Sequence, residues 1–171
     1  MKLVIASDIH GSAFWCRKLL EVCEKEQPEK LLLLGDVLYH GPRNDLPKEY
    51  APKQVIPMLD QWADKILCVR GNCEAEVDQM VLSFPCLSEY SILQADGKTF
   101  YMTHGHHGNP QNLPKLPEGS IFLYGHTHVK FDEEIGGIRC LNPGSVSIPK
   151  DGSNSCLVYE DGNFRVCILE E

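Results

Sequence analysis

The sequence predicts a mixed α and β fold in which two β-sheets pack face to face with helices outside them. Three observations lead to this prediction. The first half of the 171-residue chain alternates apolar runs of strand length with segments whose apolar residues have helical spacing. Beyond Phe84, short strands are separated by turn sequences at Asp96-Gly97, Gly136-Gly137 and Asp161-Gly162. The length suits one core and no linker or repeat divides the chain, so we expect a single domain over residues 1–171.

The first predicted strand is Leu3–Ala6, an apolar run that fits a buried position in a sheet. Ser12 is a suitable N-cap for a helix that runs to about residue 25. The apolar face of this helix holds Trp15, Leu19 and Val22. A second apolar run at residues 31–34 predicts the next strand.

The stretch from residue 39 to residue 52 is polar and rich in proline, and its length indicates a functional loop. A helix with Val55, Leu59 and Trp62 on one face should follow it. Pro57 must then lie in the first turn of this helix or kink it. A third strand at residues 66–69 and a helical pattern at 74–82 complete the first half.

Composition and charge narrow the class of protein. Apolar residues make up 43% of the chain and charged residues 23%, as in soluble globular proteins. The net charge is -8 with no basic run, which disfavours general nucleic-acid binding. No apolar stretch approaches a membrane span, and the N-terminal one is too short for a signal peptide, so we expect a cytoplasmic protein. The eight cysteines include no C-x-x-C pair, which favours reduced thiols.

Five short clusters of metal-ligand residues each follow a predicted strand. The strands cover residues 3–6, 31–34, 66–69, 100–102 and 121–124, and the clusters are Asp8-Ile9-His10, Gly35-Asp36, Gly71-Asn72, His104-Gly105-His106 and Gly125-His126-Thr127-His128. Strand ends deliver side chains to one edge of a sheet, so these residues should lie together. A lone Asp or His is more often a cap, turn or surface residue, but five clusters at the same relative position predict a metal site.

The ligand types indicate which metals are suitable. Oxygen and imidazole donors without thiolate suit manganese, iron, zinc or cobalt better than magnesium or calcium. Two such ions could hold a bridging hydroxide and clamp a phosphoryl group during in-line displacement. The two ions would carry four positive charges and the carboxylates of Asp8 and Asp36 with one hydroxide would remove three, so the site would stay cationic and attract phosphate.

The order of these clusters resembles the calcineurin-like metallophosphoesterase superfamily and, across nearly the whole chain, its bacterial YfcE-type phosphodiesterases. The matching segments are Ser7-Asp8-Ile9-His10-Gly11, Gly35-Asp36-Val37-Leu38, His40-Gly41-Pro42-Arg43-Asn44, Val69-Arg70-Gly71-Asn72-Cys73, Thr103-His104-Gly105-His106, Tyr124-Gly125-His126-Thr127-His128 and Asn142-Pro143-Gly144-Ser145-Val146-Ser147-Ile148-Pro149. The resemblance implies an α/β (α+β) fold of the four-layer αββα sandwich type.

The resemblance also implies two divalent metal ions. The ligands of one would be Asp8, His10, Asp36 and His128, and those of the other would be Asp36, Asn72, His104 and His126, with Asp36 bridging. It favours Mn²⁺, with Ni²⁺, Co²⁺, Zn²⁺ or Fe²⁺ as alternatives, and a homo-oligomer, either dimer or tetramer. The implied activity is hydrolysis of small phosphodiesters by attack of a metal-bridging hydroxide.

Residues near the expected metal ligands are candidates for catalytic or supporting roles. In much of the superfamily a histidine that can protonate the leaving group follows the metal-binding asparagine, and Cys73 stands there in this chain, as in the YfcE-type branch. With Asn72 and His104, we expect catalysis to involve Cys73, His106 and Arg43. Arg43 could bind phosphate oxygens or be a solvated charge, and His106 could contact substrate or support a ligand. Asn142-Pro143-Gly144 is best interpreted as a turn that fixes the sheet.

Two other functions remain open at this stage. A phosphomonoesterase or nucleotidase could use the same metal site. A Vps29-like scaffold would use the same architecture to bind proteins with weak or absent catalysis. Such scaffolds usually lose a metal-binding histidine, whereas this sequence keeps all seven ligand positions, and this favours an enzyme.

Overall fold

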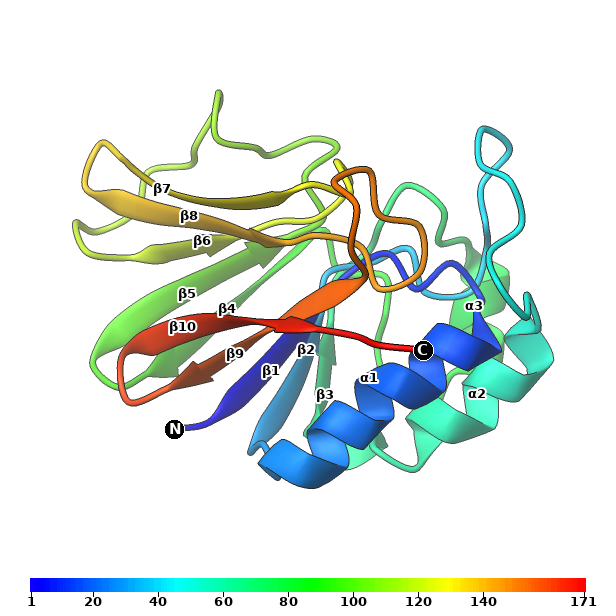
Figure 1. The fold of residues 1–171 in the computed structure, drawn as a ribbon. Helices are drawn as coiled ribbons and strands as arrows, with labels where there is room; N and C mark the ends of the chain where they lie inside the picture. The colour runs from blue at the N-terminus through cyan, green and yellow to red at the C-terminus, as the bar shows by residue number, and fades with distance from the viewer.

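The computed structural model describes residues 1–171 and contains two five-stranded sheets. The first has the order β10-β9-β1-β2-β3, with β1 (Leu3–Ala6), β2 (Lys30–Leu33), β3 (Ile66–Cys68), β9 (Ser155–Glu160) and β10 (Asn163–Ile168). The second has the order β4-β5-β6-β8-β7, with β4 (Tyr90–Ala95), β5 (Lys98–Thr103), β6 (Ile121–Leu123), β7 (Lys130–Ile135) and β8 (Ile138–Pro143). Both sheets are mixed and the helices pack on the outer side of the first sheet, which confirms the predicted α/β fold class (Figure 1).

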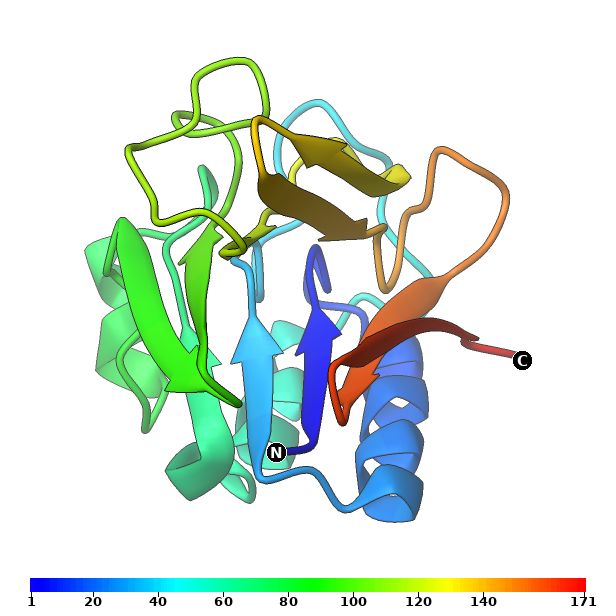
Figure 2. The same cartoon turned by 90° about the vertical axis from the view of Figure 1, so that its left-hand side faces the viewer.

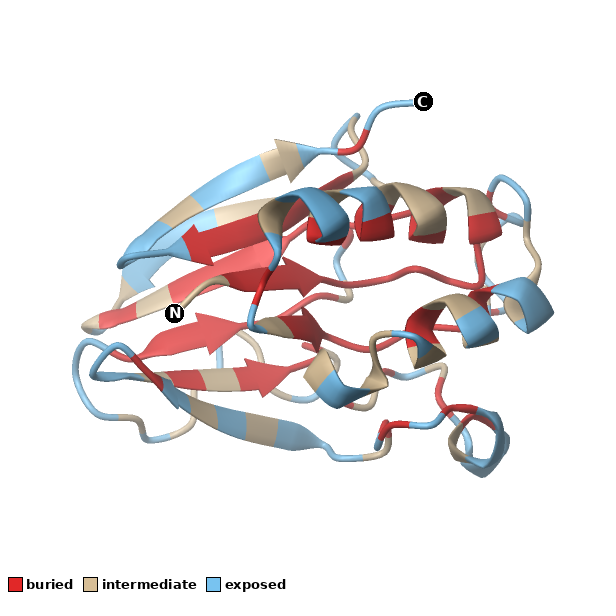
Figure 3. Ribbon diagram, turned by 90° about the horizontal axis from the view of Figure 1, so that it is seen from below, coloured by how far each residue is buried: buried red, intermediate tan, exposed pale blue.

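Alternate side chains of β1 supply both apolar layers, because successive residues of a strand point to opposite faces of the sheet. Val4 and Ala6 face the helices and belong to a cluster of 24 buried residues. Leu3 and Ile5 face the second sheet and belong to a cluster of 13 buried residues. Figure 3 shows this arrangement as buried strands in the interior and helices that are buried only on their inner side. The central strands are therefore held on both faces.

The three α-helices are α1 (Ala13–Glu26), α2 (Pro52–Asp60) and α3 (Glu76–Val81). The Ser12 hydroxyl accepts a hydrogen bond from the backbone N–H of Trp15 at 3.2 Å, which confirms the predicted N-cap of α1. None of the helices is long and apolar enough to cross a membrane.

The prediction for α2 was wrong at its C-terminal end, where Trp62 lies outside the helix. Pro57 sits inside α2 rather than in its first turn, and a proline there lacks the N–H that an interior helical position uses. The helix ends at Asp60 and a 3₁₀ turn (Ala63–Lys65) follows. Trp62 still packs against the helix-side core, so its apolar role was predicted correctly.

The three predicted hairpin turns are present, and each has two residues between its strands. Both turn residues have positive φ in every case: 50° and 72° at Asp96-Gly97, 58° and 78° at Gly136-Gly137, and 49° and 84° at Asp161-Gly162. Positive φ at both positions is the type I′ geometry that suits the twist of a hairpin. These turns lie together at one end of the molecule, on the left in Figure 1.

The outer face of the second sheet is covered by a loop. Phe122, Tyr124 and Ile138 form a small apolar cluster there, and Leu113 and Leu116 pack against it. The proline-rich loop that connects β5 to β6 supplies these two leucines. Helices cover the first sheet only. The loops that follow β1 and β2 lie at the end of the sheets opposite to the hairpin turns, and this end is where a site can form (Figure 2).

Candidate metal centre

The five predicted clusters meet at one end of the two sheets. β1, β2 and β3 are parallel neighbours, as are β5 and β6, so their C-terminal ends share an edge of each sheet. Figure 2 shows β1 and β2 pointing to the same end of the molecule, where their loops begin. The side chains brought together are Asp8, His10, Asp36, Asn72, His104, His126 and His128. The topology therefore assembles all seven residues that the sequence indicated.

Five of these residues have a left-handed backbone conformation, which is uncommon outside glycine. The φ values are 59° at Asp8, 49° at His10, 55° at Asp36, 66° at His126 and 59° at His128. A left-handed residue turns the chain sharply at the end of its strand and aims its side chain across the edge of the sheet. Such conformations cost roughly 1–3 kcal/mol each and are concentrated at functional sites.

The first group of ligand atoms comprises Asp8, His10 and His128. The Nε2 atoms of His10 and His128 lie 3.4 and 3.1 Å from Oδ1 of Asp8 and 3.3 Å from each other. All three residues are buried. This is a compact set of one oxygen and two nitrogen donors.

The second group comprises Asp36, Asn72, His104 and His126. Nε2 of His104 lies 3.3 Å from Oδ2 of Asp36, 3.0 Å from Oδ1 of Asn72 and 3.3 Å from Nδ1 of His126. Oδ2 of Asp36 is also 3.7 Å from Nε2 of His10, in the first group. The carboxylate of Asp36 therefore lies between the two groups, as a bridging ligand would.

Backbone carbonyl groups fix the tautomer of three of the imidazoles. The Nδ1 atoms of His10, His104 and His128 lie 2.8, 2.6 and 2.7 Å from the carbonyl oxygens of Tyr39, Leu34 and Ile148. A carbonyl oxygen only accepts, so each Nδ1 carries the proton and donates it. Each Nε2 then presents a lone pair to the centre, as a metal ligand must.

Oδ1 of Asp8 is a buried oxygen atom without a hydrogen-bond partner. Its nearest neighbours are the Nε2 atoms of His10 and His128, which have no proton to give it in this tautomer. By contrast, Oδ2 accepts hydrogen bonds from the Ser7 hydroxyl at 2.6 Å and from the His126 N–H at 3.0 Å. A buried carboxylate oxygen that faces only lone pairs has its charge uncompensated by hydrogen bonds, and this arrangement fits a divalent metal ion.

The carboxylates give the site a negative potential that attracts positive charge. When no metal ion is bound, His104 takes up a second proton at Nε2. Burial alone would lower its pKa, but the hydrogen bond that this N–H donates to Asp36 and the charge of Asp8 outweigh burial and raise the pKa to about 9. Burial and the neighbouring imidazoles lower the pKa of His106 to about 4. Protons or metal ions compensate the same charge here, so they compete for the site.

Glu74 supports the loops of the candidate site, and the sequence did not reveal this role. Its carboxylate accepts hydrogen bonds from three backbone N–H groups, those of Val37 at 2.7 Å, Asp36 at 2.9 Å and Gly71. It thereby joins the loop that carries Asp36 to the loop that carries Asn72. Burial and the charge of Asp36 raise the pKa of Glu74 to about 7. The only sequence signal was its position inside the third metal loop.

Gly71 and Gly125, which precede the candidate ligands Asn72 and His126, must be glycines because neighbouring side chains come too close for a Cβ atom. A Cβ atom at Gly71 would lie 2.1 Å from Oδ1 of Asp36, and one at Gly125 would lie 1.9 Å from Oγ of Ser7. The loops can therefore contact the neighbouring ligand only without side chains at these positions. This explains the Gly-Asn and Gly-His pairs.

The Asn142 to Ser147 segment supports the metal loops, in agreement with the structural interpretation of its turn. The hydroxyls of Ser145 and Ser147 donate to the carbonyl oxygen of Asp8 at 2.9 and 3.1 Å. The Asn142 side chain donates to the carbonyl oxygen of Gly125 at 2.8 Å. These contacts hold the first and fifth loops against each other.

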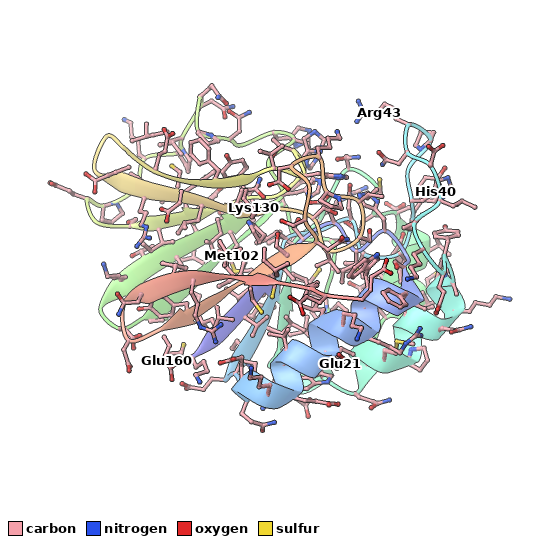
Figure 4. All side chains as sticks on the ribbon, viewed as in Figure 1. Glu21, His40, Arg43, Met102, Lys130 and Glu160 are labelled. Atoms are coloured by element: carbon pink, nitrogen blue, oxygen red, sulfur yellow. The ribbon has the colours of Figure 1, made fainter.

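A cavity of about 370 Å³ lies over the ligands, and all of its lining residues are polar. Arg43 and Lys150 are the cationic side chains in its wall. Arg43 lies on the loop between β2 and α2, which also carries His40 (Figure 4). The sequence predicted Arg43 at this site and missed Lys150. A small anion could reach the ligands and both cations together.

The remaining predicted residues lie around this cavity. The Cys73 thiol is within 4.8 Å of ligand atoms of His10 and Asp36, and burial raises its pKa, so it stays protonated. The His106 ring lies tilted against that of His104 with ring centroids 5.3 Å apart, and its Nδ1 is buried without a partner. His40 packs between Tyr39 and Tyr50 and does not line the cavity.

Comparison with known proteins places the chain in a family. Residues 1–162 match the calcineurin-like phosphoesterase superfamily domain. The chain is 47% identical to phosphodiesterase YfcE of Escherichia coli K12 over 153 residues, which cover 90% of this chain and 83% of that protein. It is 26% identical over 182 residues to phosphodiesterase MJ0936 of Methanocaldococcus jannaschii, covering 99% of this chain and all (100%) of that one.

Solved structures agree with this placement. The structure of YfcE, a phosphoesterase from E. coli, superposes with a TM-score of 0.93 at 40% identity over 99% of this chain and 100% of that one. Vacuolar protein sorting 29 from Cryptosporidium parvum superposes with a TM-score of 0.62 at 19% identity over 98% and 95%, and this likeness concerns the fold alone. The chain belongs to the calcineurin-like phosphoesterase superfamily.

Proposed function

We propose that this member of the calcineurin-like phosphoesterase superfamily is a metal-dependent phosphodiesterase that hydrolyses small phosphodiesters at a binuclear centre. The observation that carries the proposal is the buried Oδ1 of Asp8, which lacks a partner and faces imidazole lone pairs. The similarity to a phosphodiesterase at 47% identity supports the reaction class.

Seven residues would hold two divalent ions. Asp8, His10 and His128 would bind one, Asn72, His104 and His126 the other, and Asp36 both. When bound, the ions supply Lewis acidity and a water of lowered pKa for attack on phosphorus. The donor set of oxygen and imidazole suits manganese, which we propose as the native metal, with nickel, cobalt, zinc or iron as alternatives.

Other residues of the chain would bind and orient the phosphate. Arg43 and Lys150 line the polar cavity and would neutralise the charge of the diester. Backbone carbonyls hold His10, His104 and His128 in one tautomer, so their nitrogen lone pairs are oriented before substrate arrives. The protonated Cys73 thiol lies next to the ligands and would donate a hydrogen bond to an ester oxygen, which is a weaker contribution than an imidazolium would make.

The cell compartment and assembly state belong to the same proposal. We infer a cytoplasmic homo-oligomer, dimer or tetramer, that binds neither nucleic acid in general nor membranes. The acidic net charge of -8 supports the absence of nucleic-acid binding.

The test is hydrolysis by metal-stripped protein with one metal restored at a time. The substrates are bis-p-nitrophenyl phosphate and p-nitrophenyl phosphate, and the metals are manganese, nickel, cobalt, zinc and magnesium. We expect metal-dependent turnover that favours the diester, with manganese among the most active metals. His128→Ala should abolish it, because His128 belongs to the first ligand group.

His107→Ala is the matched control, since this histidine is 73% exposed in its side chain and lies outside the seven ligands. It should retain full activity. Preference for the monoester would instead indicate a phosphomonoesterase or nucleotidase. No turnover with any metal would favour the Vps29-like scaffold.

A further inference from the structure

An apolar groove of about 290 Å³ lies beside the metal centre, between α2 and α3. Figure 1 shows these two helices next to the loop that joins β2 to α2. Most of the lining residues are apolar, and they come from this loop and the two helices: Leu38, Tyr39, Tyr50, Ile56, Val77 and Val81. Tyr39, Val77 and Val81 leave 42%, 60% and 42% of their surface exposed to water. Exposed apolar surface gathered in one groove favours a ligand.

Two residues connect this groove to the metal ligands. Cys73 lines the groove, and its thiol lies within 4.8 Å of ligand atoms of His10 and Asp36. Tyr39 also lines the groove, while its backbone carbonyl accepts the hydrogen bond from Nδ1 of His10 at 2.8 Å. The groove therefore begins where the metal site ends.

At the boundary between the two regions, Gly41 packs closely against the Cys73 thiol. A Cβ atom at Gly41 would lie 3.2 Å from Sγ of Cys73 and 3.3 Å from the Asn44 side chain. Gly41 also has a φ of 78°, which disfavours other residues. Asn72 lines the polar cavity and the next residue, Cys73, lines the groove, so this pair of residues marks the boundary between the two regions.

The two regions have complementary chemistry. The cavity over the ligands has no hydrophobic residue in its lining, which suits a phosphate group. Eight of the 11 residues that line the groove are hydrophobic, which suits an aromatic or branched apolar group. A phosphodiester joins these two kinds of group through one ester bond.

We propose that the groove binds an aromatic or bulky apolar ester group of the phosphodiester substrate. This inference rests on the proposed function, because it takes the phosphate to be bound at the metal centre. It assigns Tyr39, Val77 and Val81 as residues that determine specificity. Substrates with a small polar group in this position lose the stabilisation that apolar burial provides.

The test measures binding rather than turnover, with stable phosphonates on the manganese-loaded protein. Methylphosphonate fills only the polar cavity, whereas benzylphosphonate and 2-phenylethylphosphonate add an aromatic group on two lengths of arm. Isothermal titration calorimetry should show at least one aromatic ligand binding about tenfold tighter than methylphosphonate. Val77→Ser and Val81→Ser should reduce this ratio to about twofold or less without changing the methylphosphonate Kd.

Met80→Ser is the matched control, because Met80 lies on the same helix, is 82% exposed and is not part of the groove. It should leave the ratio unchanged. Methylphosphonate binding without any aromatic advantage, or an advantage that survives both groove variants, would overturn the inference and leave the proposed function intact. Failure of methylphosphonate to bind, together with absent diester turnover, would instead overturn the proposed function.

The groove could also be covered by a second copy of the chain, and light scattering on the same variants tests this. We expect the oligomeric state to be the same in the parent protein, Val77→Ser and Val81→Ser. Dissociation of an oligomer by these variants, with unchanged phosphonate binding, would identify a subunit interface and refute the assignment.

Discussion

The two ends of this molecule both use left-handed backbone, but for different purposes. At the hairpin end, positive φ occurs in Asp96-Gly97, Gly136-Gly137 and Asp161-Gly162, where a tight turn requires it. At the metal end, positive φ occurs at Asp8, His10, Asp36, His126 and His128. Aspartate and histidine adopt this conformation more readily than most residues, but at a cost that glycine avoids, so five such residues in these loops carry strain.

This difference indicates that the hairpin end mainly stabilises the fold and that the metal end is shaped for the proposed function. Hairpin turns join neighbouring strands and use the residue types that suit them at low cost. The metal loops combine strained backbone, a buried unpartnered oxygen and close glycine contacts in order to aim seven side chains at one point. A substitution at the metal end should therefore impair activity more than folding, and one at the hairpin end should do the reverse.

The largest effect should come from Asp36→Asn. This change removes the charge that lies between both ligand groups but preserves the acceptor for the Cys73 N–H, 2.9 Å away. We expect diester turnover to fall by roughly a thousandfold or more. The free energy of unfolding of the metal-free protein should change by less than about 1 kcal/mol, as measured by urea denaturation. A large loss of stability with normal specific activity would break the comparison.

Glu74→Gln should affect both properties, because Glu74 joins two metal loops through backbone hydrogen bonds. The amide nitrogen of glutamine cannot accept from the N–H groups that it would face, so we expect a loss of about 3 kcal/mol. Metal affinity should also fall about 10- to 100-fold. Glu76→Gln, at an exposed position on α3, is the control and should be neutral in urea denaturation and metal titration.

Gly97→Ala should destabilise the protein by about 1 kcal/mol without loss of activity. Gly97 has a φ of 72° and a Cβ atom there would have no neighbour within 4 Å, so only backbone conformation opposes the change. Gly108→Ala provides a comparison in which no positive φ is needed and the nearest atom to a built Cβ is 3.8 Å away. Equal thermal midpoints for both variants would contradict the explanation from φ.

The smallest effect should be the pH dependence that Asp96 contributes. Hydrogen bonds from the N-terminal ammonium group of Met1 and from the Tyr159 hydroxyl hold the pKa of Asp96 below its ordinary value of 3.8. A pKa that is lower in the folded state adds stability above the ordinary pKa, and this is lost as pH falls through the folded value. Asp96→Asn should therefore lower the thermal midpoint slightly at pH 7 and hardly at pH 2. Asp45→Asn, at an exposed loop position, should show no such difference.

The sequence predicted both ends well where the signal was local. Each cluster of candidate metal ligands lies shortly after an apolar run, and each hairpin turn has residue types that accept positive φ. The residues that it missed act across the fold. Glu74 meets the backbone N–H groups of Asp36 and Val37 only because β2 and β3 are neighbours. Lys150 lies in the loop between β8 and β9, and only the folded arrangement of the two sheets places it at the cavity.

The α2 helix shows a limit of periodicity. Val55, Leu59 and Trp62 have helical spacing and all three contact the helix-side core, although the helix ends at Asp60. Spacing predicted burial correctly but not the end of the helix, beyond which the Trp62 N–H bonds to the Leu59 carbonyl in a turn at 2.8 Å. The roles of Arg43, Cys73 and His106 stay predictions, since their chemistry depends on a bound substrate.

The most direct test of the proposed binuclear centre is electron paramagnetic resonance of the metal-stripped protein titrated with Mn²⁺. Two manganese ions that shared Asp36 would be magnetically coupled, so we predict binding of two ions per chain and a coupled spectrum in place of the six-line signal of an isolated ion. His128→Ala should lose that coupling. A six-line spectrum at saturation with one ion per chain, or no binding, would contradict the account of the metal end given above.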